Sequence, residues 1–327
     1  MKDYLLKVEN LTITLQDKEK ELKIVDDISY LIRKNETLCM VGESGCGKTV
    51  SALSITRLLP SPLFNIHGKI FLEEKELSNL PLNELYKIRG KEIGFIFQEP
   101  LSSFNPVEKI GDQIAEVVKI HENLDKKIAK EMVYELLKHV GFKNPKLQYE
   151  LYPHELSGGM RQRAMIAMSI ILKPKLLIAD EPTTALDVTI QAQVLNLIEK
   201  LKEEYGLSIL FITHNLGIVA QIAQTVLVLY AGQVMEYSPV FELFKNPLHP
   251  YTIGLLDSVP SITKSYNFNK SIPGNPPEPS NIPSGCPFHP RCEKKMKICE
   301  TKKPSLTKID NRYVKCWLYS EGKNEHS

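Results

Sequence analysis

A short glycine-rich stretch constrains this chain more than any other feature. Residues 42–49 have the spacing G-x-x-x-x-G-K-[ST], in which glycines let backbone N–H groups curl around phosphate oxygens. The apolar run at residues 37–41 predicts a buried strand, and residues 49–59 predict a helix that Pro60 ends. Strand, loop and helix together predict a nucleoside triphosphate site. Its expected contacts are Gly42, Glu43, Ser44, Gly45, Cys46, Gly47, Lys48, Thr49 and Val50.

Two residues of this loop have defined expected roles. Lys48 is expected to reach the β- and γ-phosphates, and Thr49 to bind Mg²⁺. Cys46 is expected to be a spacer, and Cys39 a core residue. The alternative interpretation is a glycine-rich turn without a ligand, which the flanking strand and helix disfavour.

Composition limits the partners and the compartment. The chain has 41 Lys and Arg against 39 Asp and Glu, so the bulk charge implies no nucleic acid partner. No apolar run reaches the roughly 18 residues that span a bilayer, and residues 1–4 do not begin a signal peptide. We therefore expect a soluble cytoplasmic chain, for which any membrane role would have to come through partner subunits.

The hydrophobic pattern predicts an α/β fold. A helical region at about 99–157 interrupts the strands, and β and α alternate after it, which is typical of a parallel sheet covered by helices on both faces. Beyond about residue 235 the pattern weakens, and the proline-rich residues 272–284 predict an extended strap. The expected strands are 22–32, 69–72, 93–97, 176–179, 208–213 and 225–230; the expected helices are 81–89, 110–120, 128–140, 158–172, 188–205 and 215–224.

Two further motifs suggest phosphate chemistry. The apolar run 176–179 ends in Asp180 and Glu181, where a carboxylate can hold Mg²⁺ and its neighbour can polarise a water. Ser157 precedes Gly158 and Gly159 at a helix start, which predicts a second anion site. The alternatives are a pair of solvated acids at a strand end and an ordinary helix start.

The order of these motifs resembles the ATP-binding-cassette (ABC) ATPases over residues 1 to about 240. The resemblance rests on the loop at 42–49, on Gln98, on the Leu-Ser-Gly-Gly-Met sequence at 156–160, on the acids after 176–179, on Ala185-Leu186-Asp187, and on His214. It implies a phosphate-loop core with a parallel sheet, an antiparallel β subdomain and a helical insert at about 99–157. The predicted domains are 1–240 and a cysteine-containing C-terminal extension, 241–327.

The same resemblance implies how the site works. Such domains act as head-to-tail pairs, so Ser157, Gly158 and Gly159 would contact the nucleotide of the other subunit, and Asp187 would touch that subunit. Gln98 would contact Mg²⁺ and water, with Thr49 and Asp180 as further Mg²⁺ ligands. Glu181 would be the general base. His214 would contact the γ-phosphate, its alternative being a local hydrogen bond.

The adenine site departs from the family pattern. Residues 14–24 contain no aromatic side chain on which the base could stack. The candidate supports are Leu15, Ile24 and Val25.

Within the ABC ATPases, the chain most resembles the ATPase subunits of oligopeptide and dipeptide importers. This narrower resemblance rests on residues 97–106, 247–252 and 285–292. That implies two transmembrane permease subunits, an extracytoplasmic peptide-binding protein, and a second, non-identical ATPase at the cytoplasmic face of the membrane. The alternative is a soluble ABC ATPase acting in DNA repair or on ribosomes. The sequence has no sustained heptad run and only one cassette, which disfavours the alternative.

Four cysteines lie close together near the C-terminus: Cys286, Cys292, Cys299 and Cys316. Four thiolates can hold a [4Fe-4S] cluster or a zinc ion. Zinc sites usually have tighter cysteine pairs than these, and the family resemblance implies the cluster. The expectation is therefore [4Fe-4S], with zinc or free thiols as alternatives.

Overall fold

The structure is a computed structural model that describes residues 4–17, 20–184, 186–258 and 272–320. The described chain forms two compact units. Unit 1 comprises Met1–Leu6, Ile32–Glu36 and Asn79–Phe211, and unit 2 comprises Lys7–Leu31, Thr37–Ser78 and Ile212–Ser327. Ala185, part of the motif after Glu181, lies outside the described residues. Residues 212–327 fall in one unit, so the domain boundary near residue 240 stays a sequence-based prediction.

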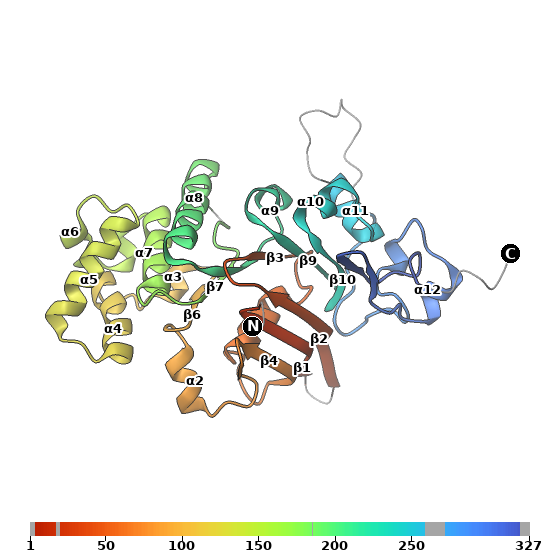
Figure 1. Cartoon of the computed structure of the whole chain (residues 1–327), viewed down its shortest axis with the longest axis horizontal. Helices are drawn as coiled ribbons and strands as arrows, with labels where there is room; N and C mark the ends of the chain where they lie inside the picture. Colours follow the sequence, from red (N-terminus) through yellow and green to blue (C-terminus); the bar gives the residue numbers. More distant parts are fainter. Residues whose placement is uncertain (1–3, 18–19, 185, 259–271, 321–327) are drawn as a thin grey trace. The chain divides into compact units, whose positions relative to one another are not determined.

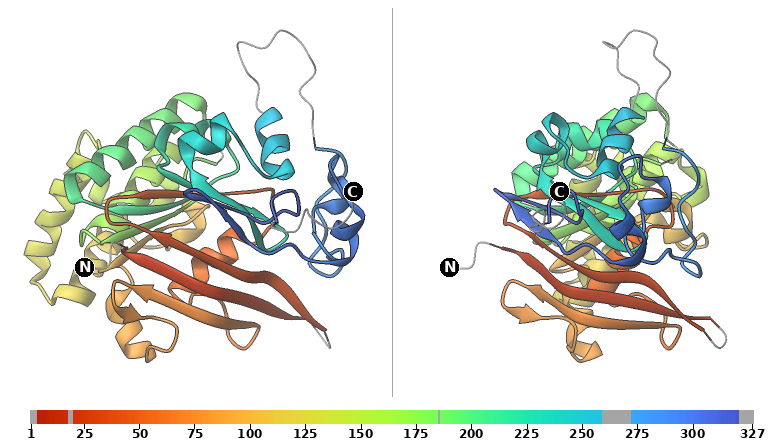
Figure 2. Two further views of the ribbon diagram at one scale, coloured as in Figure 1. Left: turned by 45° about the vertical axis from the view of Figure 1, so that its right-hand side comes forward. Right: turned by 90° about the vertical axis from the view of Figure 1, so that its right-hand side faces the viewer.

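Unit 2 contains a sheet with the strand order β2-β1-β4-β5. Its strands are β1 (Leu6–Asp17), β2 (Lys20–Ile32), β4 (Phe64–Leu72) and β5 (Lys75–Glu76), and β4 runs antiparallel to β5. Buried positions recur along β1 between more exposed ones, as expected for a sheet with one face on the core. The red strands β1 and β2 lie side by side in both views of Figure 2.

A second group of strands in unit 2 leads into the phosphate loop. Its order is β11-β12-β10-β9-β3, and β3 (Thr37–Val41), buried at every position, runs parallel to β9 (Thr225–Tyr230). The antiparallel members are β10 (Gln233–Pro239), β11 (Thr307–Ile309) and β12 (Arg312–Val314). The helices of unit 2 are α1 (Lys48–Ile55), α9 (Leu216–Ile222), α10 (Val240–Lys245), α11 (Pro250–Asp257) and α12 (Lys297–Thr301).

In unit 1, β8 (Ser208–Ile212), β7 (Leu176–Asp180) and β6 (Ile93–Ile96) follow one another in the sheet order, with β6 and β7 parallel. The predicted helical insert is confirmed, and α4, α5 and α6 lie together in Figure 1. The helices are α2 (Leu82–Ile88), α3 (Pro100–Ser103), α4 (Ile110–Glu122), α5 (Lys126–His139), α6 (Pro145–Tyr149), α7 (Gly158–Ile170) and α8 (Val188–Tyr205).

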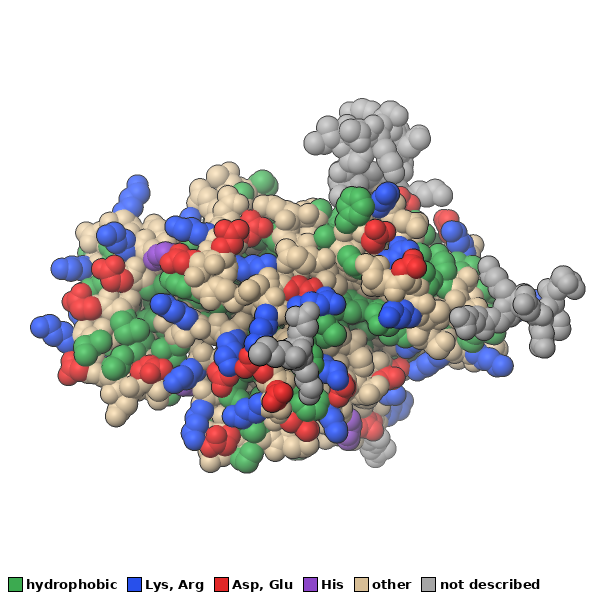
Figure 3. Space-filling view, viewed as in Figure 1, with side chains coloured by type: hydrophobic (Ala, Val, Ile, Leu, Met, Phe, Trp, Pro, Cys, Tyr) green, Lys and Arg blue, Asp and Glu red, His purple; other side chains and the backbone are tan. Residues whose placement is uncertain are grey.

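Two surface properties bear on partners. On the face drawn in Figure 3, basic and acidic side chains are interspersed, in keeping with a formal net charge of +2. Within the described ranges, no helix combines the length and the apolar character needed to cross a bilayer.

Candidate functional site

The phosphate loop lies between β3 and α1, and close backbone approaches fix its two ends. A Cβ on Gly42 would lie 2.2 Å from the carbonyl oxygen of Leu229 in β9, and one on Gly47 would lie 2.9 Å from the carbonyl oxygen of Ile24 in β2. Both glycines also have positive φ angles, +155° and +100°. Only glycine fits such positions without a clash, so the local fold itself selects the motif.

Lys48 lies inside this loop. Its side chain is 6% exposed, and its Nζ donates to the carbonyl oxygens of Gly42 (2.8 Å) and Glu43 (2.9 Å). Ser44, Gly45 and Thr49 are exposed around it. A cation held under exposed loop residues at the start of a helix suits a phosphate group, and the exposed Thr49 hydroxyl is a suitable oxygen ligand for Mg²⁺.

The first x residue of the motif, Glu43, is held by residues far away in the sequence. Its backbone N–H donates to the Tyr251 hydroxyl (3.0 Å), and its carboxylate pairs with Arg291, with the shortest N–O distance at 2.6 Å. Sequence reasoning missed both partners. Arg291 stands 248 positions from Glu43, and only its place between a proline and a cysteine sets it apart in the sequence.

Unit 1 brings Gln98 and Glu181 together. Gln98 Nε2 donates to Glu181 Oε2 at 3.5 Å, and the Thr184 hydroxyl donates to the same oxygen at 2.8 Å. Glu181 has a φ of +45°, an uncommon backbone conformation for a residue with a Cβ and one that concentrates at functional sites. Its neighbour Asp180 ends β7 and is only 2% exposed.

The predicted signature lies at the start of α7. Ser157 is exposed and caps the helix by accepting the Met160 N–H at 3.3 Å, while Gly158 and Gly159 are half-buried. A Cβ on Gly159 would lie 2.9 Å from the side chain of Ile190 in α8. The glycine pair is therefore accessible from solvent, as contact with another subunit requires.

Asp187 and His214 lie at the ends of other elements. Asp187 is exposed and caps α8 by accepting the Ile190 N–H at 2.9 Å. His214 is also exposed, and the N–H of the preceding Thr213 donates to Met40 in β3 at 3.2 Å. His214 therefore follows a segment bonded to the strand that enters the phosphate loop.

Of the three candidate adenine supports, Val25 is fully buried, whereas Leu15 and Ile24 are partly exposed. Contact of adenine with Leu15 or Ile24 therefore stays a prediction.

The metal prediction for the C-terminal cysteines is not supported. Cys286, Cys292, Cys299 and Cys316 line one cavity. Among the described residues, no group of three or more His, Cys, Asp or Glu side chains could hold a metal ion. The expected [4Fe-4S] cluster and its zinc alternative therefore have no support among the described residues.

None of these four cysteines forms a disulfide. Burial raises the pKa of Cys286 to about 12 and that of Cys316 to about 11, and it also raises the pKa of Cys292.

Comparison with known proteins assigns the class. Residues 25–184 match the family model described as ABC transporter, and residues 235–299 match the one described as oligopeptide/dipeptide transporter, C-terminal region. A solved dimeric bacterial ABC transporter cassette superposes with a TM-score of 0.64 at 25% identity, covering 72% of this chain and 98% of that one. The fold and the phosphate loop are those of an ABC ATPase.

Two curated relatives narrow the class. The oligopeptide transport ATP-binding protein AppD of Bacillus subtilis (strain 168) is 50% identical over 325 residues, covering 99% of each chain. The oligopeptide transport ATP-binding protein OppD of Escherichia coli (strain K12) is 45% identical over 302 residues, covering 92% of this chain and 89% of that one. The chain belongs to this family of ABC transporter ATP-binding proteins.

Proposed function

We propose that this chain hydrolyses ATP to power the uptake of dipeptides or oligopeptides across the cytoplasmic membrane. The observation that carries the proposal is the similarity to AppD, named for oligopeptide transport, over 99% of both chains. The match of residues 235–299 to a transporter-specific C-terminal region supports it independently. The alternative, a soluble ABC ATPase that acts in DNA repair or on ribosomes, does not explain the match of residues 235–299.

In this proposal the loop residues 42–50 bind the triphosphate. Lys48 neutralises charge on the β- and γ-phosphates, and the loop N–H groups orient them. When bound, Mg²⁺ would supply positive charge that offsets the negative charge developing on the phosphate groups during hydrolysis. Its ligands would be Thr49, Gln98 and Asp180, whose hydroxyl, amide and carboxylate oxygens suit this ion.

The remaining residues activate water and complete the site. Glu181 takes a proton from the attacking water as general base, and its contacts with Gln98 and Thr184 hold the carboxylate in place. His214 contacts the γ-phosphate. Ser157, Gly158 and Gly159 bind the nucleotide of a second ATPase subunit, with Asp187 at the same junction. The exposure of Ser157 and the dimeric relative support this pairing.

The proposed assembly contains two transmembrane permease subunits, a second and non-identical ATPase, and an extracytoplasmic peptide-binding protein. The chain would sit at the cytoplasmic face of the membrane as a peripheral subunit, with residues 1–240 as the nucleotide-binding domain and 241–327 as an extension. The balance of 41 basic and 39 acidic residues gives no reason to add a nucleic acid partner.

The substitution Glu181→Gln tests the mechanism. It keeps the shape of the side chain but removes the base, so ATP should still bind while turnover in the assembled complex falls about 100-fold or more. The matched control is Glu203→Gln on α8, which is exposed and should leave both quantities unchanged. Hydrolysis by Glu181→Gln within a few-fold of the native rate would remove Glu181 from this role.

A further inference from the structure

All the N–H groups of the Arg291 guanidinium donate hydrogen bonds within unit 2. Nε donates to Pro273 O (2.8 Å) and Nη2 to Gly274 O (3.1 Å), while Nη1 donates to the Tyr230 hydroxyl (3.2 Å). The other two bonds go to the carboxylate of Glu43, at 2.6 and 2.9 Å. These five bonds match the five N–H donors of arginine, so the side chain has a single defined position.

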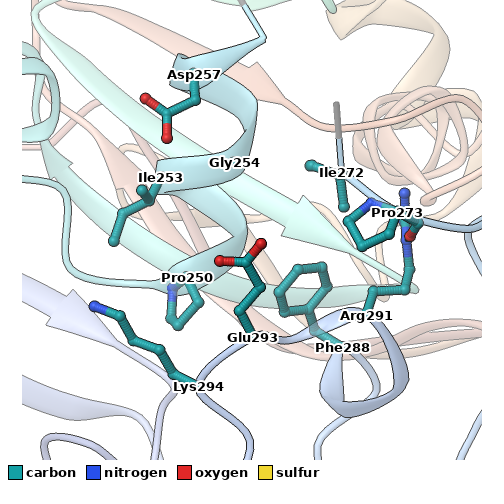
Figure 4. Close-up of a pocket in the computed structure, with 10 residues that line it drawn as sticks. All are labelled: Pro250, Ile253, Gly254, Asp257, Ile272, Pro273, Phe288, Arg291, Glu293 and Lys294. Atoms are coloured by element: carbon teal, nitrogen blue, oxygen red, sulfur yellow. The ribbon is translucent and has the colours of Figure 1, made fainter. Parts of the chain in front are cut away.

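Packing around Arg291 supports this position. Its side chain is only 6% exposed, and the rings of Tyr230, Tyr251 and Phe288 form a contiguous aromatic cluster with centroid separations of 4.7 to 5.3 Å. Arg291 and Phe288 also line a cavity of about 100 Å³, where Figure 4 shows Arg291 beside Pro273. The pair with Glu43, whose side chain is 25% exposed, is thus partly shielded from water, which strengthens it relative to a fully exposed ion pair.

Glu43 is consequently held at four atoms: both carboxylate oxygens, the backbone nitrogen and the backbone carbonyl oxygen. Arg291 binds the carboxylate, Tyr251 accepts the backbone N–H, and Lys48 donates to the backbone carbonyl. Arg291 and Tyr251 lie outside residues 25–184, the part that matches the general ABC transporter model. The C-terminal region therefore helps to hold Glu43, the second residue of the phosphate loop, in place.

The charges of Arg291 and Glu43 affect how the loop can bind a phosphate group. Glu43 places a carboxylate inside a loop whose other features suit a phosphate group, and an unpaired carboxylate there would repel the triphosphate. The bidentate pair with Arg291 neutralises that charge and turns the carboxylate toward the C-terminal region.

We propose that Arg291 is a positioning residue for the phosphate loop: it orients and neutralises Glu43, so the affinity of the loop for ATP depends on the C-terminal region. This inference rests on the proposed ATPase function. Arg291 itself does not touch the nucleotide.

The test is the affinity of the purified full-length chain for MgATP, measured by isothermal titration calorimetry. Arg291→Met leaves Glu43 as an uncompensated carboxylate and should raise the Kd about 10-fold, equal to about 1.4 kcal/mol. Glu43→Gln removes the offending charge and should change the Kd by less than about 3-fold. The double variant should return to within about 3-fold of the native Kd, because neither charge remains.

The relative Kd values of these three variants distinguish charge compensation from a merely structural role of Arg291. If the pair only held the fold together, Arg291→Met and Glu43→Gln would weaken binding alike, and the double variant would be at least as weak. Either that pattern or a native Kd for Arg291→Met overturns the inference. Arg291→Lys supplies a milder variant should the methionine form fold poorly. It should still raise the Kd, because an ammonium cannot make the paired bonds of a guanidinium.

The control variant is Lys303→Met, which removes the ion pair between Lys303 in the predicted extension 241–327 and Asp26 (2.8 Å), where the lysine side chain is 52% exposed. It should leave the Kd within about 2-fold of native, because exposed pairs contribute little, and a loss equal to that of Arg291→Met would overturn the inference. If the native chain itself bound no MgATP, the proposed function would fail. Native binding with no effect of Arg291→Met would refute only the role of Arg291.

Discussion

Alanine substitutions at two glycines of the phosphate loop should differ sharply in cost. Gly42 and Gly45 both have positive φ angles, +155° and +77°, and forcing an alanine into such a conformation costs about 1–2 kcal/mol. At Gly45 no atom lies within 4 Å of the added Cβ, whereas at Gly42 the Leu229 carbonyl oxygen lies 2.2 Å away. Overpacking of this kind adds about 1–3 kcal/mol.

We therefore expect Gly45→Ala to lower the free energy of unfolding by about 1–2 kcal/mol, and Gly42→Ala by about 2–5 kcal/mol. Urea unfolding followed by the fluorescence of Trp317, the one tryptophan of the chain, provides the assay. Trp317 belongs to the same unit as the loop, and its Nε1 donates to the Lys302 carbonyl oxygen at 2.9 Å. Equal losses for the two variants would refute the argument from the contact with β9.

Two further predictions concern pH and the second subunit. Burial lowers the pKa of His249 to about 3, so between about pH 6.5 and 3 the unfolded state binds a proton that the folded state does not. The free energy of unfolding therefore falls by up to about 1.4 kcal/mol per pH unit as the pH drops through this range. His249→Asn should flatten this pH dependence in urea titrations relative to the native chain, and an unchanged slope would contradict the lowered pKa of His249. Ser157→Arg places a bulky cation at an exposed position and should preserve MgATP binding by the isolated chain while abolishing hydrolysis in the assembled complex, measured by phosphate release. Full hydrolysis would exclude Ser157 from the contact between subunits.

Periodicity and motif spacing predicted much of the core because long apolar patterns leave few alternatives. The bounds expected for α8 and β9, residues 188–205 and 225–230, are those observed. The parallel pairing of β3 with β9 and of β6 with β7 also follows from alternating strands and helices. These elements carry their own signal, since the side chains that bury them recur at the period of the element.

The region after residue 235 was harder to predict because its signal is not local. β10 contains Gln233, Glu236 and Ser238, all buried, and a polar strand of this kind shows no apolar alternation. Glu236 accepts the backbone N–H groups of Leu248 and His249. A polar residue whose partners lie beyond its own element looks like a loop residue in the sequence.

In the candidate site, too, some residues were predicted from local sequence motifs, whereas others were missed because their partners are distant in the sequence. Gln98 and Glu181 were placed by motif order, and the structure brings their side chains together at 3.5 Å. The pair of Arg291 and Glu43 was invisible, since 248 positions separate the partners and neither charge departs from what a surface residue would show. The cysteines are a third case: the four of them line one cavity, but no metal-binding group is found among the described residues, and sequence spacing alone does not fix the geometry that a metal needs.

Peptide-dependent ATP hydrolysis tests the central claim most directly. The chain would be reconstituted in proteoliposomes with its permease subunits and second ATPase, and phosphate release would be measured while the peptide-binding protein is supplied with or without peptide. The account predicts hydrolysis that rises with peptide and disappears with Glu181→Gln, together with accumulation of peptide across the membrane. Hydrolysis that ignores peptide and the permeases, or peptide uptake that persists with Glu181→Gln, would contradict it.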